Sequence, residues 1–116
     1  MSSTLDTPDI GFRGDGAAER RPGRYLELVC GDEARRIALE QDIVHLGRGL
    51  GADLRFDVPT VSRRHAVLVQ RREEVRLLDD RSVRGTFVNG RRVLAATLAD
   101  GDRIALGDVV LTFHEA

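Results

Sequence analysis

Short runs in which apolar and polar residues alternate cover the chain from Tyr25 to His114. The runs are rich in Val, Leu and Ile and end near Gly, Asp, Asn or Ser, which is typical of β-strands separated by turns. The predicted strands are Tyr25–Cys30, Arg35–Leu39, Ile43–Gly47, Leu54–Phe56, His65–Gln70, Val75–Asp79, Thr86–Val88, Arg91–Leu94, Arg103–Leu106 and Val109–His114. No segment shows a convincing helical period. Many short strands at this spacing predict an all-β protein, specifically an antiparallel β-sandwich.

Dipeptides that contain glycine mark the predicted turns. Asn89-Gly90 is a strong signal for a two-residue hairpin, because both positions of that turn need positive φ. Gly31-Asp32 and Gly107-Asp108 resemble turns of the same kind. If the strands simply alternated in direction, the turn after Gly47 and the turn before His65 would lie at opposite ends of the sandwich.

The chain divides near Arg24. Residues 1–23 combine Gly, Pro, Asp, Ser and Thr with isolated apolar residues, so they are predicted to form a flexible N-terminal tail. Residues 24–116 then form one domain of sufficient length for a hydrophobic core. The single cysteine excludes an internal disulfide and a cysteine-rich metal site. No run approaches membrane-spanning length and residues 1–21 lack a signal peptide, so we expect a cytoplasmic protein without membrane insertion. We also expect the protein to be a monomer.

The charge of the chain is unevenly distributed. All 18 basic residues are arginines and the net charge is −1, yet residues 43–92 hold 11 arginines against 6 acidic residues. Several of these arginines alternate with Ser and Gly in predicted turns. A guanidinium group offers a planar fork of donors that fits a phosphate or carboxylate, and serine adds a neutral hydroxyl donor. The pattern indicates a local site for a small anion rather than general binding to a polyanion.

Four motifs in order resemble the forkhead-associated (FHA) domain. They are Gly47-Arg48, Ser62-Arg63-Arg64-His65, Asp80-Arg81-Ser82-Val83-Arg84-Gly85-Thr86-Phe87-Val88-Asn89-Gly90, and Gly101-Asp102 with Leu106-Gly107. Each dipeptide alone is weak, but the ordered set is highly specific and covers roughly residues 24–114. The resemblance implies an eleven-stranded β-sandwich, with loops at one end that bind a phosphothreonine peptide, and it implies neither catalysis nor a cofactor.

The resemblance also implies roles for individual residues. Arg48, Ser62 and Arg63 match positions that contact the phosphate, whose oxygens are strong acceptors with between one and two negative charges. The remaining matches imply residues that support the site structurally without contacting the phosphate. They are the loop glycines Gly47 and Gly85, the motif histidine His65 and the hairpin asparagine Asn89. The convergence of Arg48 and Ser62 is an implication of the resemblance and not of the strand pattern.

Two positions depart from the family pattern. Arg84 stands where the family usually has an asparagine that binds the peptide backbone, and arginine donates hydrogen bonds but cannot accept them. Arg84 could favour an acidic peptide residue, contact the phosphate or point to solvent. Val83 stands where Thr or Ser is common, which removes a hydroxyl contact.

Four classes of function compete on this evidence. The first is a phosphothreonine-dependent interaction module in bacterial Ser/Thr kinase signalling, with a kinase or its substrates as partners. The second is a degenerate FHA domain that binds unphosphorylated partners or self-associates. Nucleic-acid binding is disfavoured because aromatic residues are only 4% of the chain. A hydrolase built on Ser62 and His65 is disfavoured because no nucleophile-elbow motif accompanies them.

Two threonines in the tail add a regulatory hypothesis. Thr4 and Thr7 lie in an acidic stretch that a kinase could reach. Small FHA proteins that resemble this one are inhibited when a phosphothreonine in the tail occupies their own binding loops. A short tether would hold the local concentration near millimolar.

Overall fold

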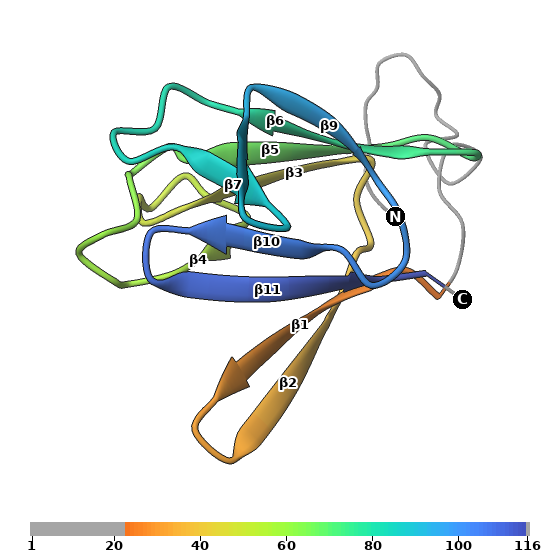
Figure 1. The fold of residues 1–116 in the computed structure, drawn as a ribbon, viewed down its shortest axis with the longest axis horizontal. Coiled ribbons are helices and arrows are strands. Elements are labelled where there is room, and N and C mark those ends of the chain that lie inside the picture. Colours follow the sequence, from red (N-terminus) through yellow and green to blue (C-terminus); the bar gives the residue numbers. More distant parts are fainter. Residues whose placement is uncertain (1–22, 116) are drawn as a thin grey trace.

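The computed structural model describes residues 23–115, which form two packed β-sheets (Figure 1). The strands are β1 (Tyr25–Cys30), β2 (Glu33–Ala38), β3 (Ile43–Gly47), β4 (Leu54–Arg55), β5 (Ala66–Gln70), β6 (Val75–Asp79), β7 (Thr86–Val88), β8 (Arg91–Val93), β9 (Ala95–Leu98), β10 (Arg103–Leu106) and β11 (Val109–His114). The six-stranded sheet has the order β2-β1-β11-β10-β7-β8, and the five-stranded sheet has the order β4-β3-β5-β6-β9. The predicted β-sandwich is therefore confirmed.

The core lies between the two sheets and follows the alternation of the strands. In β5 every second residue is buried, and β11 shows the same pattern. Leu68 and Leu77 from one sheet and Ile104, Leu111 and Phe113 from the other are fully buried. Burial of a large apolar side chain contributes roughly 1.5–3 kcal/mol, so this core holds the strand ends and the loops they carry in place.

The hairpin turns form where the dipeptides predicted them. Asn89 and Gly90 have φ of 52° and 82°, as a two-residue turn with two left-handed positions requires. Gly31 and Gly107 also have positive φ, 62° and 60°. The predicted turns are confirmed at all three places.

One strand was missed from the sequence. After Asn89-Gly90 the sequence predicted only Arg91–Leu94, whereas the chain crosses between the sheets at Leu94 and forms a further strand, β9. β8 pairs with β7 in the six-stranded sheet, whereas β9 pairs with β6 in the five-stranded sheet. The Leu94 carbonyl accepts a hydrogen bond from Asp79 N–H at 2.9 Å at the crossing. Alternation alone cannot reveal such a change of sheet.

A buried arginine joins the beginning and the end of the described domain. The Arg24 side chain is fully buried, and its Nε donates to the Glu115 carboxylate at 2.8 Å. Its terminal nitrogens donate to the Arg71 and Arg72 carbonyl oxygens at 2.6 and 3.0 Å. Both ends of the described chain therefore lie at one end of the sandwich, on the right of Figure 1.

Residues 1–22 of the predicted tail, including Thr4 and Thr7, lie outside the described residues. Within residues 23–115, no helix is long and apolar enough to cross a membrane.

Candidate functional site

Three loops meet at the end of the sandwich opposite Arg24: residues 48–53, 56–65 and 80–85 (Figure 1). Arg48 N–H donates to the Ser62 carbonyl at 2.9 Å, and Gly49 N–H donates to the Arg63 carbonyl at 3.1 Å. Asp80 N–H donates to the His65 carbonyl at 2.9 Å and brings in the third loop.

Strand direction explains why the first two loops meet. β3 and β5 pair directly and antiparallel, with Leu46 opposite Ala66, whereas the short β4 runs parallel to β3. The chain between β3 and β5 therefore starts and finishes at the same end of the sandwich, where β3 ends and β5 begins. The expectation from simple alternation, that the turns after Gly47 and before His65 lie at opposite ends, is wrong.

Gly47 lies where the two loops are closest. An added Cβ atom would lie 2.1 Å from the Arg63 carbonyl oxygen and 2.9 Å from its carbon. Real Cβ atoms do not approach backbone this closely, so only glycine allows this contact. Gly47 therefore sets the spacing between Arg48 and the Ser62-Arg63 segment.

The Arg48 side chain is fixed by a hydrogen bond at Nε, whereas its two terminal nitrogens are available to a ligand. Its Nε donates to the Val61 carbonyl at 3.0 Å, and its own carbonyl accepts a hydrogen bond from Arg55 Nε at 2.8 Å. Within residues 23–115, the terminal nitrogens of Arg48 have no hydrogen-bond partner. A guanidinium group fixed at Nε can present its other donors to an anion with little loss of entropy.

Ser62 is oriented as a donor. Its Oγ accepts a hydrogen bond from Val83 N–H at 2.9 Å, which leaves its own hydroxyl proton for another acceptor. The half-buried side chain thus joins the loop at residues 56–65 to the loop at residues 80–85.

His65 supports both of these loops from below. The side chain is fully buried, its Nδ1 accepts from Ser62 N–H at 3.0 Å, and its Nε2 lies 2.9 Å from the Gly85 carbonyl. Since a carbonyl can only accept, the ring proton resides on Nε2. Neither nitrogen contacts the Ser62 hydroxyl, so the geometry does not form a serine–histidine pair for nucleophilic catalysis.

Asp79 anchors the third loop through the Ser82 side chain. Its carboxylate accepts hydrogen bonds from the Ser82 hydroxyl, from Thr86 Oγ1 at 2.6 Å and from Ser82 N–H at 3.3 Å. Ser82 Oγ in turn accepts from Gly85 N–H at 2.9 Å. Burial raises the pKa of Asp79, but the hydrogen bonds from Ser82 and Thr86 outweigh it, and the pKa lies below its ordinary value.

The lowered pKa of Asp79 predicts a pH-dependent contribution to stability. The ionised carboxylate stabilises the folded state above the pKa of the unfolded chain, and this contribution disappears as the pH falls through the folded pKa. We expect Asp79→Asn to lower the free energy of unfolding by about 1–2 kcal/mol at pH 7. Urea unfolding between pH 7 and pH 3 should show the difference from the native protein shrinking toward acid. A constant difference would contradict an ionised anchor.

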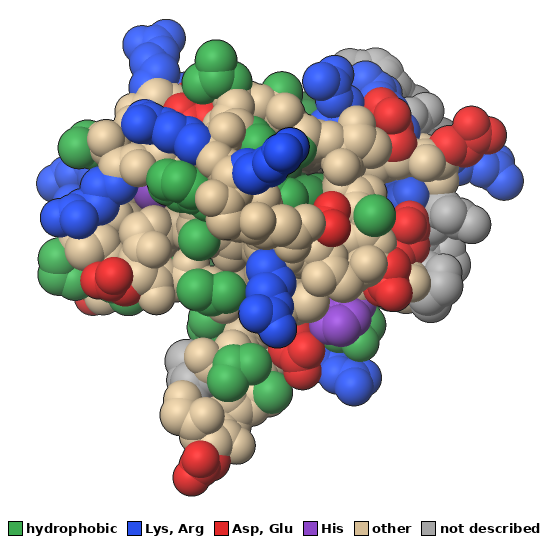
Figure 2. Space-filling model, viewed as in Figure 1, with side chains coloured by type: hydrophobic (Ala, Val, Ile, Leu, Met, Phe, Trp, Pro, Cys, Tyr) green, Lys and Arg blue, Asp and Glu red, His purple; other side chains and the backbone are tan. Residues whose placement is uncertain are grey.

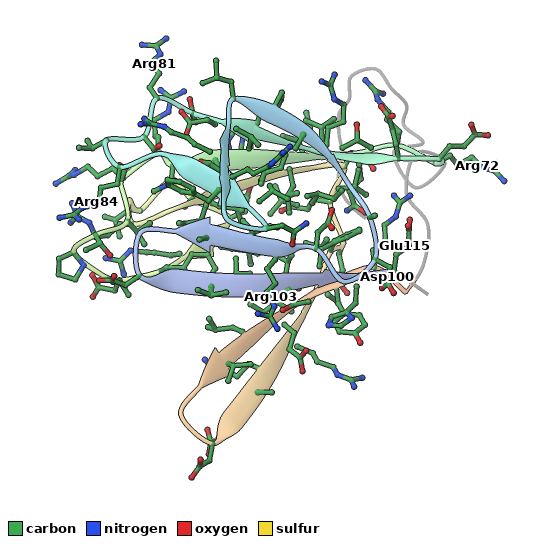
Figure 3. All side chains as sticks on the ribbon, viewed as in Figure 1. Arg72, Arg81, Arg84, Asp100, Arg103 and Glu115 are labelled. Atoms are coloured by element: carbon green, nitrogen blue, oxygen red, sulfur yellow. The ribbon has the colours of Figure 1, made fainter. Side chains whose placement is uncertain are left out.

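The remaining predicted contacts are exposed at the same end. Val83 is 85% exposed, and the side chains of Arg63 and Arg84 are exposed without a hydrogen bond or ion pair to residues 23–115. Figure 3 shows Arg84 directed outward from the loops, and Figure 2 shows basic side chains gathered at this end of the molecule. Arg64, by contrast, is paired with Asp80 at 3.1 Å.

Asn89 lies away from this group. Its side chain accepts from Arg103 N–H and donates to the Asp102 carboxylate, both at 3.0 Å. It therefore joins the β7–β8 turn to the β9–β10 turn rather than contacting the three loops. Within residues 23–115, no cluster of His, Cys, Asp or Glu could hold a metal ion.

No role was assigned from the sequence to the residues that hold the predicted contact residues in place. Asp79 and Ser82, three positions apart, have the spacing with which Asp side chains close local turns, and this signal could have been read. The contact of Arg55 with the Arg48 carbonyl had no such signal.

Comparisons with known proteins identify the family. The family model of the FHA domain matches residues 44–107. The glycogen accumulation regulator GarA of Mycobacterium tuberculosis is 40% identical over 94 residues, which are 79% of this chain and 58% of that protein. The curated relatives that match most strongly are longer, and the chain spans 8% to 58% of their lengths.

Solved structures give the same result. An FHA domain from a study of phosphothreonine-dependent FHA interactions has a TM-score of 0.72 and 32% identity, and covers 80% of this chain and 96% of its own. The FHA domain of FhaA, complexed with the intracellular domain of Rv3910, has a TM-score of 0.74 and 34% identity over 79% of this chain and 100% of its own.

Proposed function

Because this chain belongs to the FHA domain family, we propose that it binds phosphothreonine segments of partner proteins and acts in bacterial Ser/Thr kinase signalling. The partners would be kinases or their substrates, since these carry phosphothreonine. The protein would act by binding and not by catalysis.

The convergence of Arg48, Ser62 and Arg63 supports this proposal most directly. Arg48 and Ser62 each have free donors, while their other atoms are held by Val61 and Val83. A phosphate group offers strong acceptor oxygens with one to two negative charges, which match a hydroxyl and two guanidinium groups. Charge-assisted contacts of this type are about twice as strong as neutral hydrogen bonds.

Paired peptide titration tests the function. A degenerate phosphothreonine peptide library and its unphosphorylated counterpart should be titrated by calorimetry against the native protein. Binding of the phosphorylated library alone is the expected result. Equal binding of both libraries, or of the unphosphorylated one only, would instead identify a degenerate FHA domain, which the apolar, exposed Val83 would favour.

Arg84 predicts which phosphopeptides bind best. Its exposed guanidinium group lies in the loop that also carries Val83, so acidic residues after the phosphothreonine should be preferred. We expect Arg84→Asn to reduce this preference by about two- to fivefold, as loss of an exposed charge pair implies. A peptide array probed with both proteins provides the measurement. An unchanged profile would mean that Arg84 does not contact the peptide.

A further inference from the structure

Among residues 23–115, no strand pairs with the outer edge of the six-stranded sheet at β2. β2 is the terminal strand of that sheet, and Leu39 N–H donates to the Arg24 carbonyl at 3.0 Å just beyond its end. Hydrogen-bonded pairs alternate in an antiparallel ladder, so the backbone groups of Ala34, Arg36 and Ala38 point away from β1. Such an edge can accept an additional strand from another polypeptide.

A cleft of about 620 Å³ adjoins this edge, between β2 and β4. Figure 1 shows that β1 and β2 project beyond the five-stranded sheet, which leaves the inner face of the hairpin partly uncovered. Five apolar residues line the cleft: Leu28, Ile37, Ala38, Leu54 and Phe56. A strand added to β2 would place alternate side chains in this cleft, since successive residues point to opposite faces.

The charges of the cleft favour an acidic occupant. Arg35, Arg36 and Arg55 line it together with two carboxylates, of which Asp53 already accepts a hydrogen bond from His45 N–H at 2.8 Å. The Arg35 side chain forms no hydrogen bond or ion pair within the described part of the chain. Charged residues on an edge strand prevent indiscriminate pairing, and here they select a strand of opposite charge.

One residue of the cleft contacts the segment that carries Arg48. Arg55, which lines the cleft, donates from Nε to the Arg48 carbonyl at 2.8 Å. Through β4, the cleft is also joined to β3, where Gly47 lies opposite Arg55. A partner segment that leaves the phosphate site on the side of Arg55 would therefore run toward the cleft.

We propose that the cleft between β2 and β4 is a second binding site, which takes an extended acidic segment of the phosphorylated partner as an added strand on β2. On the face toward the cleft, the segment places an apolar residue beside Ile37 and a carboxylate beside Arg35. On the outer face, it places a carboxylate beside Arg36. This proposal builds on the proposed function, because the phosphothreonine occupies the Arg48–Ser62 site at the same time. Two linked contacts raise affinity without any change in the phosphate site itself.

Extended phosphopeptides test the second site. A short phosphothreonine peptide selected from the library is joined through a Gly-Ser linker to Val-Asp-Asp-Asp-Val, to Val-Arg-Arg-Arg-Val or to Gly-Ser-Gly-Ser-Gly, on either side of the phosphothreonine. The symmetric sequences make the result independent of strand direction. Calorimetry should show that the acidic extension binds about tenfold more tightly than the Gly-Ser extension. Amide hydrogen exchange at Ala34, Arg36 and Ala38 should slow at the same time.

Two variants separate strand addition from general attraction of charge. Ala34→Pro removes an N–H that does not bond β1, so the fold tolerates it while strand addition is blocked. Arg35→Glu should reverse the preference toward Val-Arg-Arg-Arg-Val. Arg72→Glu is the matched control, because Figure 3 shows Arg72 far from β2, and it should retain the preference of the native protein for the acidic extension.

The outcomes distinguish the two proposals. Failure of the short phosphopeptide to bind would overturn the proposed function, and the cleft would then be judged from amide exchange with unphosphorylated Val-Asp-Asp-Asp-Val at millimolar concentration. Equal affinities for the three extensions would overturn the second site and leave the proposed function intact. Loss of the acidic preference in Arg72→Glu as well would also overturn it, because the effect would then be long-range charge.

Discussion

Replacing Arg48 with alanine should abolish the preference for phosphothreonine peptides over their unphosphorylated counterparts. The side chain is positioned by its hydrogen bond to the Val61 carbonyl at 3.0 Å, and its terminal donors are free to bind the phosphate. Truncation of one partner in a desolvated, charge-assisted contact costs about 2–5 kcal/mol, which is at least about thirtyfold in affinity. Calorimetric titration of the same phosphopeptide into both proteins measures the change.

Arg103→Ala is a suitable control for Arg48→Ala. Arg103 is an exposed arginine on β10, which Figure 3 shows well away from the loops that carry Arg84. Its loss removes the same charge from the molecule as a whole, so it should change the affinity by less than about twofold if the effect of Arg48 is local. Equal losses in the two variants would mean that the phosphate responds only to net charge.

Replacing Gly47 with alanine should damage both the fold and the site. The added methyl group would lie 2.1 Å from the Arg63 carbonyl oxygen, which belongs to backbone and cannot rotate away. The loop at residues 56–65 must move and break the hydrogen bond between Arg48 N–H and the Ser62 carbonyl. We expect the free energy of unfolding to fall by about 2–4 kcal/mol.

The matched control for Gly47→Ala is Gly51→Ala. An added Cβ at Gly51 meets no atom within 4 Å, and Gly51 lies in the loop that follows Arg48. Denaturant unfolding should give a change of less than about 0.5 kcal/mol for this variant. Similar destabilisation by both substitutions would show that the cost does not arise from the contact with Arg63, because the loss of unfolded-state entropy on replacing Gly with Ala stabilises a fold.

The sequence predicted the local structure well where a physical rule acts within a few residues. Asn89-Gly90 defined a hairpin because both residues must adopt positive φ, and their φ of 52° and 82° agree. The buried strand β5 followed from alternation alone. The crossing between sheets at Leu94 did not, because the apolar residues on its two sides face different partners that the sequence does not identify.

The residues of the candidate site were proposed from the sequence, whereas their arrangement could not be predicted from it. The resemblance to the FHA family indicated Arg48 and Ser62, whereas the strand pattern alone separated them. Ser62 Oγ is oriented by Val83 N–H, 21 residues away, and His65 is oriented by the Gly85 carbonyl, 20 residues away. Contacts of this separation depend on the complete sandwich, so local patterns cannot predict them.

The buried ion pair between Arg24 and Glu115, 2.8 Å apart, also decides how this domain can be handled experimentally. It holds both ends of the described chain together at the end opposite the three loops (Figure 1). A tag, a fluorescent protein or a sensor surface attached at the end after Glu115 would therefore leave Arg48 and Ser62 facing outward. The point of attachment and the candidate binding loops then lie at opposite ends of the sandwich, so immobilisation would not block access of a peptide to the loops.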